Sequence, residues 1–69
     1  MTSSDLARIV AQANAIGRSR GLFCCYKMDG TQFAWVFYRR GPMGLIRLGK
    51  TTDAAQVLNR MTRYAEVPA

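Results

Sequence analysis

Histidine is absent from this chain, and acidic residues are scarce. Of the 69 residues, none is His and four are Asp or Glu, against ten Lys or Arg. Histidine is the usual general base near neutral pH and the commonest metal ligand, so its absence argues against enzymes that depend on either role. The acids have local structural explanations at helix starts (Asp5 and Asp53), in a turn (Asp29) and in the tail (Glu66). We therefore expect a non-enzymatic protein with no catalytic residue, no metal site and no cofactor.

Cysteine is limited to the adjacent pair Cys24 and Cys25. Neighbouring residues in a strand point to opposite faces, which is the wrong geometry for a disulfide between them. Two cysteines without a histidine also fall short of a tetrahedral zinc site. We expect two free thiols in a reducing cytoplasm.

Long apolar runs are absent too. None approaches the ~18 residues that a membrane-spanning helix needs. The first residues, MTSSDLARIV, lack the basic and apolar regions of a secretory signal. Together with the free thiols, these absences predict a cytoplasmic protein without a membrane partner.

The most informative stretch spans residues 21–40 and predicts two β-strands joined by Asp29-Gly30. A two-residue turn at that point pairs Met28 with Thr31. Because side chains alternate along a strand, the larger apolar groups share one face, which we assign to the core. That face holds Leu22, Cys24, Tyr26, Phe33, Trp35 and Phe37.

Helical periodicity flanks the strands on both sides. Apolar stripes lie within residues 6–16 and 54–65, and Gly17 is placed to end the first helix. Hydroxyl side chains suited to N-caps precede both stripes. The candidates are Ser3 or Ser4 for the first helix, and Thr51 or Thr52 for the second.

A turn at residues 41–44 leads into a third strand over residues 45–50. We expect this loop to pair Arg40 with Leu45. The same register sets Phe37 opposite Leu48, which brings Ile46 and Leu48 to the core face.

The predicted order is α-β-β-β-α, in a single small α+β domain over residues 1–69. The simplest arrangement is a three-stranded antiparallel sheet with both helices packed on one face. The other face, called the open face below, then mixes apolar and basic side chains. It holds Phe23, Cys25, Lys27, Gln32, Ala34, Val36, Tyr38, Arg40, Leu45 and Arg47.

The net charge of +6 favours an anionic partner, either nucleic acid or an acidic protein surface. Aromatic side chains on an open sheet can stack bases while Lys and Arg hold phosphates. The same residues can instead pack against a second copy with arginines at the rim, and the charge can serve solubility alone. The candidate binding residues are Phe23, Lys27, Tyr38, Arg40, Arg47 and Lys50.

Our first interpretation is a small, basic, non-enzymatic module that binds nucleic acid through the open face and flanking arginines. The alternative is a small phage or mobile-element protein that binds and inhibits a host protein. We also expect a homodimer, because the core of so small a domain is modest. Apolar burial against a second copy would come from Phe23, Cys25, Val36 and Leu45.

The element order resembles that of the double-stranded-RNA-binding domain and of mRNA-interferase toxins. The first family carries a lysine cluster at the start of its last helix, where this chain has Lys50 alone, and the second uses a hairpin histidine that this chain lacks. The segment LGKTTDAAQVL, residues 48–58, resembles the strand-to-helix junction of phage-integrase arm domains, which read DNA with a three-stranded sheet. Gly49-Lys50-Thr51 also resembles the end of a P-loop, but we interpret residues 50–52 as a helix cap.

Overall fold

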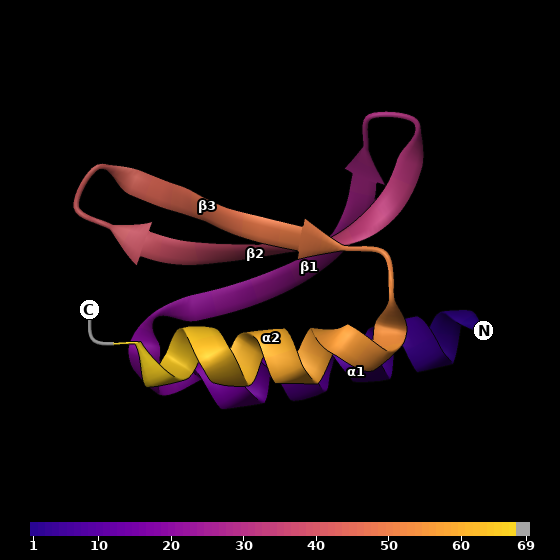
Figure 1. The fold of residues 1–69 in the computed structure, drawn as a ribbon, viewed down its shortest axis with the longest axis horizontal. Helices are drawn as coiled ribbons and strands as arrows, with labels where there is room; N and C mark the ends of the chain where they lie inside the picture. The colour runs from indigo at the N-terminus through magenta and orange to yellow at the C-terminus, as the bar shows by residue number, and fades with distance from the viewer. Residues whose placement is uncertain (68–69) are drawn as a thin grey trace.

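The computed structural model describes residues 1–67 and has the α-β-β-β-α order that the sequence predicts. The three strands form one antiparallel sheet in the order β1-β2-β3. Figure 1 shows the two helices lying side by side beneath one face of this sheet. Pro68, expected in the tail, lies outside the described residues. The elements are α1 (Ser3–Gly17), a 3-10 turn η1 (Arg18–Arg20), β1 (Leu22–Asp29), β2 (Gln32–Gly41), β3 (Gly44–Thr51) and α2 (Ala54–Glu66).

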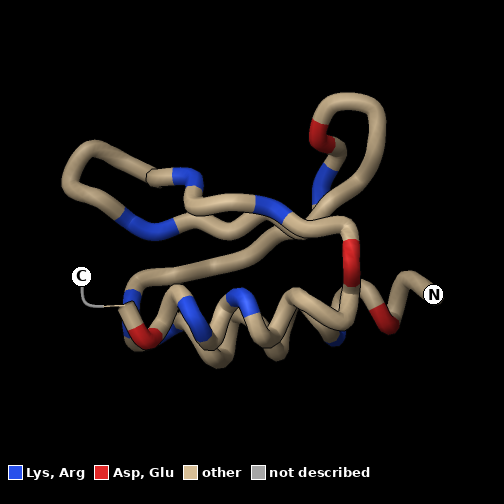
Figure 2. Tube along the Cα trace, in the orientation of Figure 1, with Lys and Arg blue, Asp and Glu red and all other residues tan. Residues whose placement is uncertain are grey.

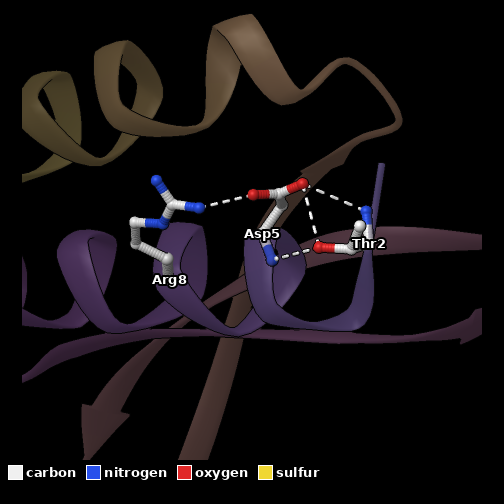
Figure 3. Close-up of polar contacts among 3 residues, drawn as sticks. All are labelled: Thr2, Asp5 and Arg8. Atoms are coloured by element: carbon white, nitrogen blue, oxygen red, sulfur yellow. Dashed lines mark hydrogen bonds and ion pairs between the residues drawn. The ribbon is translucent and has the colours of Figure 1, made fainter.

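Thr2 caps α1, so the prediction of Ser3 or Ser4 as the cap is wrong by one or two residues. The Thr2 hydroxyl accepts a hydrogen bond from the Asp5 N–H at 3.2 Å, and the Thr2 N–H donates to the Asp5 carboxylate at 3.1 Å. Figure 3 shows this reciprocal capping box, with Arg8 ion-paired to the same carboxylate. Hydrogen bonds from Thr2 lower the pKa of Asp5.

Asp53 caps α2 in place of the predicted Thr51 or Thr52. Its carboxylate accepts from the Ala55 N–H at 3.0 Å. The Thr51 hydroxyl instead accepts from the Asp53 N–H at 3.1 Å, which orders the turn leading into the helix. An acid at this position is favourable because it meets the positive end of the helix dipole.

Gly17 does not end α1 in the way expected. The chain continues through η1, and the left-handed residue that stops it is Gly21, with a φ of 69°. Gly17 is buried, and a Cβ there would lie 2.8 Å from both the Leu22 Cβ and the Met61 Sδ. Glycine is therefore needed at this point for the close approach of α1 to β1 and α2.

The core lies between the helices and the face of the sheet assigned to it. Trp35 and Phe37 are buried there, whereas Tyr38 on the other face is half-buried, so the assignment of faces is correct. The helices contribute the buried Ala13, Val57 and Met61. Tyr64 of α2 packs on Phe37 with ring centres 5.4 Å apart.

The β1–β2 register differs from the prediction by two residues. Asp29 pairs with Gln32, so the turn residues are Gly30 and Thr31 rather than Asp29 and Gly30. Gly30 has a φ of 66°, as the first position of a type II′ turn requires. A shift of two residues keeps every side chain on its predicted face, because the side-chain period of a strand is two.

The β2–β3 register begins as predicted and then breaks. Arg40 pairs with Leu45, but Phe37 lies opposite Gly49 because a β-bulge follows the pairing of Tyr38 with Arg47. Leu48 is the extra residue of the bulge and has no pairing partner on β2. It is half-buried and packs against the core. The bulge also moves Lys50 to the open face, opposite Val36. The expectation that Ile46 joins the core is wrong, because 51% of Ile46 is exposed.

The sheet is strongly bent. Figure 1 shows the end of the β1–β2 hairpin turning away from the helices, while the β2–β3 hairpin extends in another direction above them. The bend removes helical cover from the end of the first hairpin. Met28 and Phe33, on the core face of the sheet, are therefore 52% and 51% exposed.

Candidate nucleic-acid interface

Two aromatic side chains form the centre of the open face. Phe23 and Tyr38 are paired directly across β1 and β2, and their rings stack with centres 5.4 Å apart and planes inclined by 24°. The Lys27 ammonium lies 5.0 Å from the centre of the Tyr38 ring. This contact is a cation–π interaction, and the neighbouring Tyr38 side chain raises the pKa of Lys27. The sequence predicted all three residues for this site.

Asp29 adds a negative charge to the same face. Its carboxylate accepts from the Arg47 guanidinium at 3.1 Å and forms an ion pair with the Lys50 ammonium. Hydrogen bonds, first from Lys50 and then from Arg47, lower the pKa of Asp29. The interpretation of Asp29 as a turn residue missed this role, because these contacts depend on the bend that brings the hairpin end to β3. One carboxylate thus offsets part of the charge of two predicted binding residues.

Arg40 lies at the opposite end of the face from Asp29. It lines a surface hollow of about 320 Å³, together with Arg18 of η1 and Phe23. The hollow contains no acidic residue. The Arg40 N–H donates to the Gly21 carbonyl at 2.9 Å, which ties the end of β2 to the chain entering β1. Arg18 follows α1 in η1, and its place beside Arg40 depends on the path of η1.

The apolar middle of the open face is already covered by the protein itself. Val36 is fully buried, with Cys25 beside it on one neighbouring strand and Lys50 on the other. Ala34 is buried as well. The expected apolar patch is therefore smaller than the sequence indicated. A second copy seated on this face would gain nothing from Val36.

The structure places the six predicted site residues along one face, in three parts. Phe23, Tyr38 and Lys27 form the stacked centre, and Arg47 and Lys50 share Asp29. Arg40 is separated from Asp29 by the aromatic pair and belongs to the hollow that it shares with Arg18. Figure 2 shows Lys and Arg residues along both the sheet and the helices, so the positive charge is not confined to this face.

The buried Cys24 is not a reactive thiol. Burial, followed by the neighbouring Cys25, raises the pKa of Cys24 to about 12. A thiol with so high a pKa is protonated at neutral pH and is a poor nucleophile. Both cysteines are free, as the strand geometry predicted. Within residues 1–67, no group of three His, Cys, Asp or Glu side chains could hold a metal ion.

The resemblance to a P-loop is closer in sequence than a match to its end alone. Gly44 stands five positions before Gly49, so residues 44–51 fit the full spacing of the motif. A phosphate-binding loop must leave its N–H groups free in a turn before a helix. Here residues 44–51 are strand β3, paired with β2, and α2 begins only at Ala54. The structure therefore contradicts a P-loop.

Comparison with known proteins found no relative of this chain. No protein-family model, curated protein or solved structure matches this chain. The resemblances to RNA-binding, toxin and integrase domains therefore stop at the order of elements and the short segment over residues 48–58. In the part of the chain that the structure describes, no helix is long and apolar enough to cross a membrane.

Proposed function

We propose that this protein is a small, non-enzymatic module that binds single-stranded nucleic acid on its open face. The observation that carries the proposal is the stacked pair of Phe23 and Tyr38, which has a cation above the Tyr38 ring and further cations at both ends. Proteins that bind single strands combine aromatic platforms for bases with positive charges that follow the backbone.

The charge distribution supports a path for the phosphates. Arg40 and Arg18 line a hollow beside Phe23, and no acid offsets them there. At the other end, Arg47 and Lys50 share the single carboxylate of Asp29. An incoming phosphate would compete with Asp29 for these two cations, so the end at Arg40 is expected to contribute more to affinity than the end at Asp29.

A single strand fits this face better than a duplex does. The aromatic groups are half-buried side chains of a sheet, and a base must be unpaired to stack on them. The lysine cluster that would hold a duplex backbone at the start of the last helix is missing, since Asp53 occupies the cap of α2.

The test is fluorescence anisotropy with a labelled oligothymidylate of about 20 nucleotides, titrated over about 50–200 mM salt. We expect saturable binding whose affinity falls linearly with salt on a double-logarithmic plot. The matched variants are Arg40→Ala on the open face and Arg63→Ala on α2, and only the first should weaken binding. No binding at the lowest salt, or equal losses for the two variants, would rule out the open face as the site.

A second candidate function, binding of a host protein, has one specific observation in its favour. Met43 at the β2–β3 turn is 97% exposed and is followed by the exposed Leu45 and Ile46. Exposed apolar side chains grouped in this way are typical of protein contacts. Binding of this kind would depend much less on salt than binding to phosphates does.

A further inference from the structure

The two edges of the sheet are protected differently. On β1, the Asn14 side chain of α1 takes the place of a neighbouring strand. The Cys24 N–H donates to the Asn14 Oδ1 at 2.7 Å, and the Asn14 Nδ2 donates to the Cys24 carbonyl at 3.2 Å. An edge whose backbone groups are occupied in this way cannot accept another strand at that position.

The β3 edge has a comparable contact only at its end. The Arg60 guanidinium of α2 donates to the Lys50 carbonyl at 2.7 Å. Farther along the strand, the direction of the backbone groups follows from β2. The Arg40 N–H points toward Gly21, so Leu45, which lies opposite Arg40, must direct its own N–H and C=O away from β2.

Arg47, two residues on and opposite Tyr38, has the same orientation as Leu45. Among residues 1–67, no hydrogen bond takes up these outward groups of Leu45 or Arg47. The side chains at this free edge are apolar and exposed, with 56% of Leu45 and 51% of Ile46 accessible on opposite faces of the strand. The segment therefore has the unpaired backbone and the apolar flanks that invite a further strand.

We propose that β3 pairs antiparallel with β3 of a second copy of this chain, about a two-fold axis at Ile46. In this register the residues with outward backbone groups pair with each other. Leu45 lies opposite the second copy's Arg47, and Arg47 lies opposite the second copy's Leu45. Ile46 then faces the second copy's Ile46, so two half-exposed apolar side chains cover each other. Centring the axis on Arg47 would instead set two guanidinium groups directly opposite, which is unfavourable.

The charges favour a second copy at β3 rather than at β1. The open part of β1 has outward groups on Tyr26 and Met28, so an equivalent pairing would centre on Lys27 and oppose two ammonium groups. On β3, the cation next to the axis is Arg47, which would lie opposite the second copy's Leu45 and is already paired with Asp29 of its own chain. Pairing of β1 of one copy with β3 of another would leave one edge of each copy free for a further copy, so it would give filaments and not a closed dimer.

The pairing has a structural consequence for the open face. A two-fold axis perpendicular to the sheet keeps like faces on the same side, so two three-stranded sheets become one six-stranded sheet. The two open faces become continuous, and neither is covered. The interface is short, so the dimer is expected to be weak. The proposal does not depend on nucleic-acid binding.

The first test is cross-linking under oxidised glutathione. In the proposed register Ile46 occupies a non-hydrogen-bonded pair, whose Cα separation of about 4.5 Å suits a disulfide. We expect Ile46→Cys to give a covalent dimer. The matched control, Met28→Cys, has the same exposure on the β1 edge and should give no more dimer than the wild type, whose own two thiols are present in both variants.

The second test is analytical ultracentrifugation of the unmodified chain up to about 1 mM, which spans the weak range expected of a short interface. We expect the average mass to rise above that of the 7.7 kDa monomer, with Ile46→Lys remaining monomeric and Met28→Lys behaving as wild type. Circular dichroism checks that the variants are folded. A wild-type monomer at every concentration, or equal cross-linking of the two cysteine variants, would overturn the proposal whether or not nucleic acid binds.

Discussion

The two faces of the sheet are built from the same three strands but have different chemistry. On the helix side, alternate residues of β1 and β2 are buried beneath α1 and α2, and aromatic rings there contact apolar neighbours, as Phe37 contacts Tyr64. On the open side, the intervening residues stack beneath charged groups, as Tyr38 does beneath Lys27. Alternation along a strand thus separates the groups that stabilise the fold from the groups available for binding.

The bend in the sheet limits this division. Where the β1–β2 hairpin turns away from the helices, Met28 and Phe33 on the helix side become exposed. On the open side, Val36 is fully buried even though no helix covers it. The face on which a residue lies therefore predicts its role only in part, and the substitutions of Trp35 and Tyr38 are the sharpest test of the comparison.

The largest effect is expected at Trp35. Trp35→Ala should lower the free energy of unfolding by about 3–5 kcal/mol, because it leaves a cavity against Tyr26 and the helices, and that loss is enough to unfold most of a domain this small. Tyr38→Ala, on the open side, should cost much less and should instead weaken oligonucleotide binding. Urea denaturation followed by circular dichroism measures the loss of stability in both variants, and fluorescence anisotropy measures the loss of binding. Equal destabilisation by the two substitutions would remove the distinction between the faces.

Charge reversal on the open face is expected to have the next largest effect. Arg40→Glu combined with Arg47→Glu should weaken oligonucleotide binding by at least about 100-fold and reduce the salt slope by about two, as the loss of two phosphate contacts requires. The circular dichroism spectrum should not change, because both side chains are exposed. Reversal of Arg8 and Arg63 on the helices is the control with the same change in net charge. Equal loss in the control would mean that net charge alone drives binding.

A smaller effect is expected where α1 approaches the sheet on the helix side. Gly17→Ala should lower the free energy of unfolding by about 1–3 kcal/mol, because the added Cβ would lie 2.8 Å from Leu22 and Met61. Ala15→Gly, at an exposed position of the same helix, is the comparison for helix propensity alone and should cost about 1 kcal/mol. If Gly17→Ala proved neutral or stabilising, the close packing there would not be essential.

The sequence predicted which residues share a face better than it predicted which residues pair. The β1–β2 register moved by two residues, yet Trp35 and Phe37 stayed in the core because a shift of two preserves the face. A bulge changes the face of everything beyond it, and nothing in the local pattern marked the one at Leu48. That bulge moved Lys50 to the open face beside Arg47.

Contacts between distant segments were the least predictable. The pairing of Asp29 with two cations of β3 depends on the bend of the sheet. The hydrogen bonds between the Asn14 side chain and the Cys24 backbone depend on how α1 crosses the β1 edge. Neither follows from periodicity or turn propensity, which act over a few residues. The candidate site was therefore predicted as a set of residues, but its internal ion pairs and the hollow shared by Arg18 and Arg40 were not.

The smallest effect is expected from Asp29, whose ion pairs belong to the open side. Its pKa is lowered in the folded protein, so its contribution to stability is present above the ordinary pKa of an aspartate and is lost as pH falls through the lower, folded value. Asp29→Asn should therefore lower the urea midpoint slightly at pH 7, and the difference from wild type should shrink as the pH falls and vanish below the folded pKa of Asp29.

The same substitution acts on binding in the opposite direction. Without the carboxylate, Arg47 and Lys50 are released to an incoming phosphate, so oligonucleotide affinity should rise while stability falls. Asp53→Asn is the matched control, because it makes the same charge change at the cap of α2, away from the stacked aromatic pair. If Asp53→Asn raised the affinity as much as Asp29→Asn, the gain would come from net charge, and Asp29 would have no specific role in holding the open-face cations.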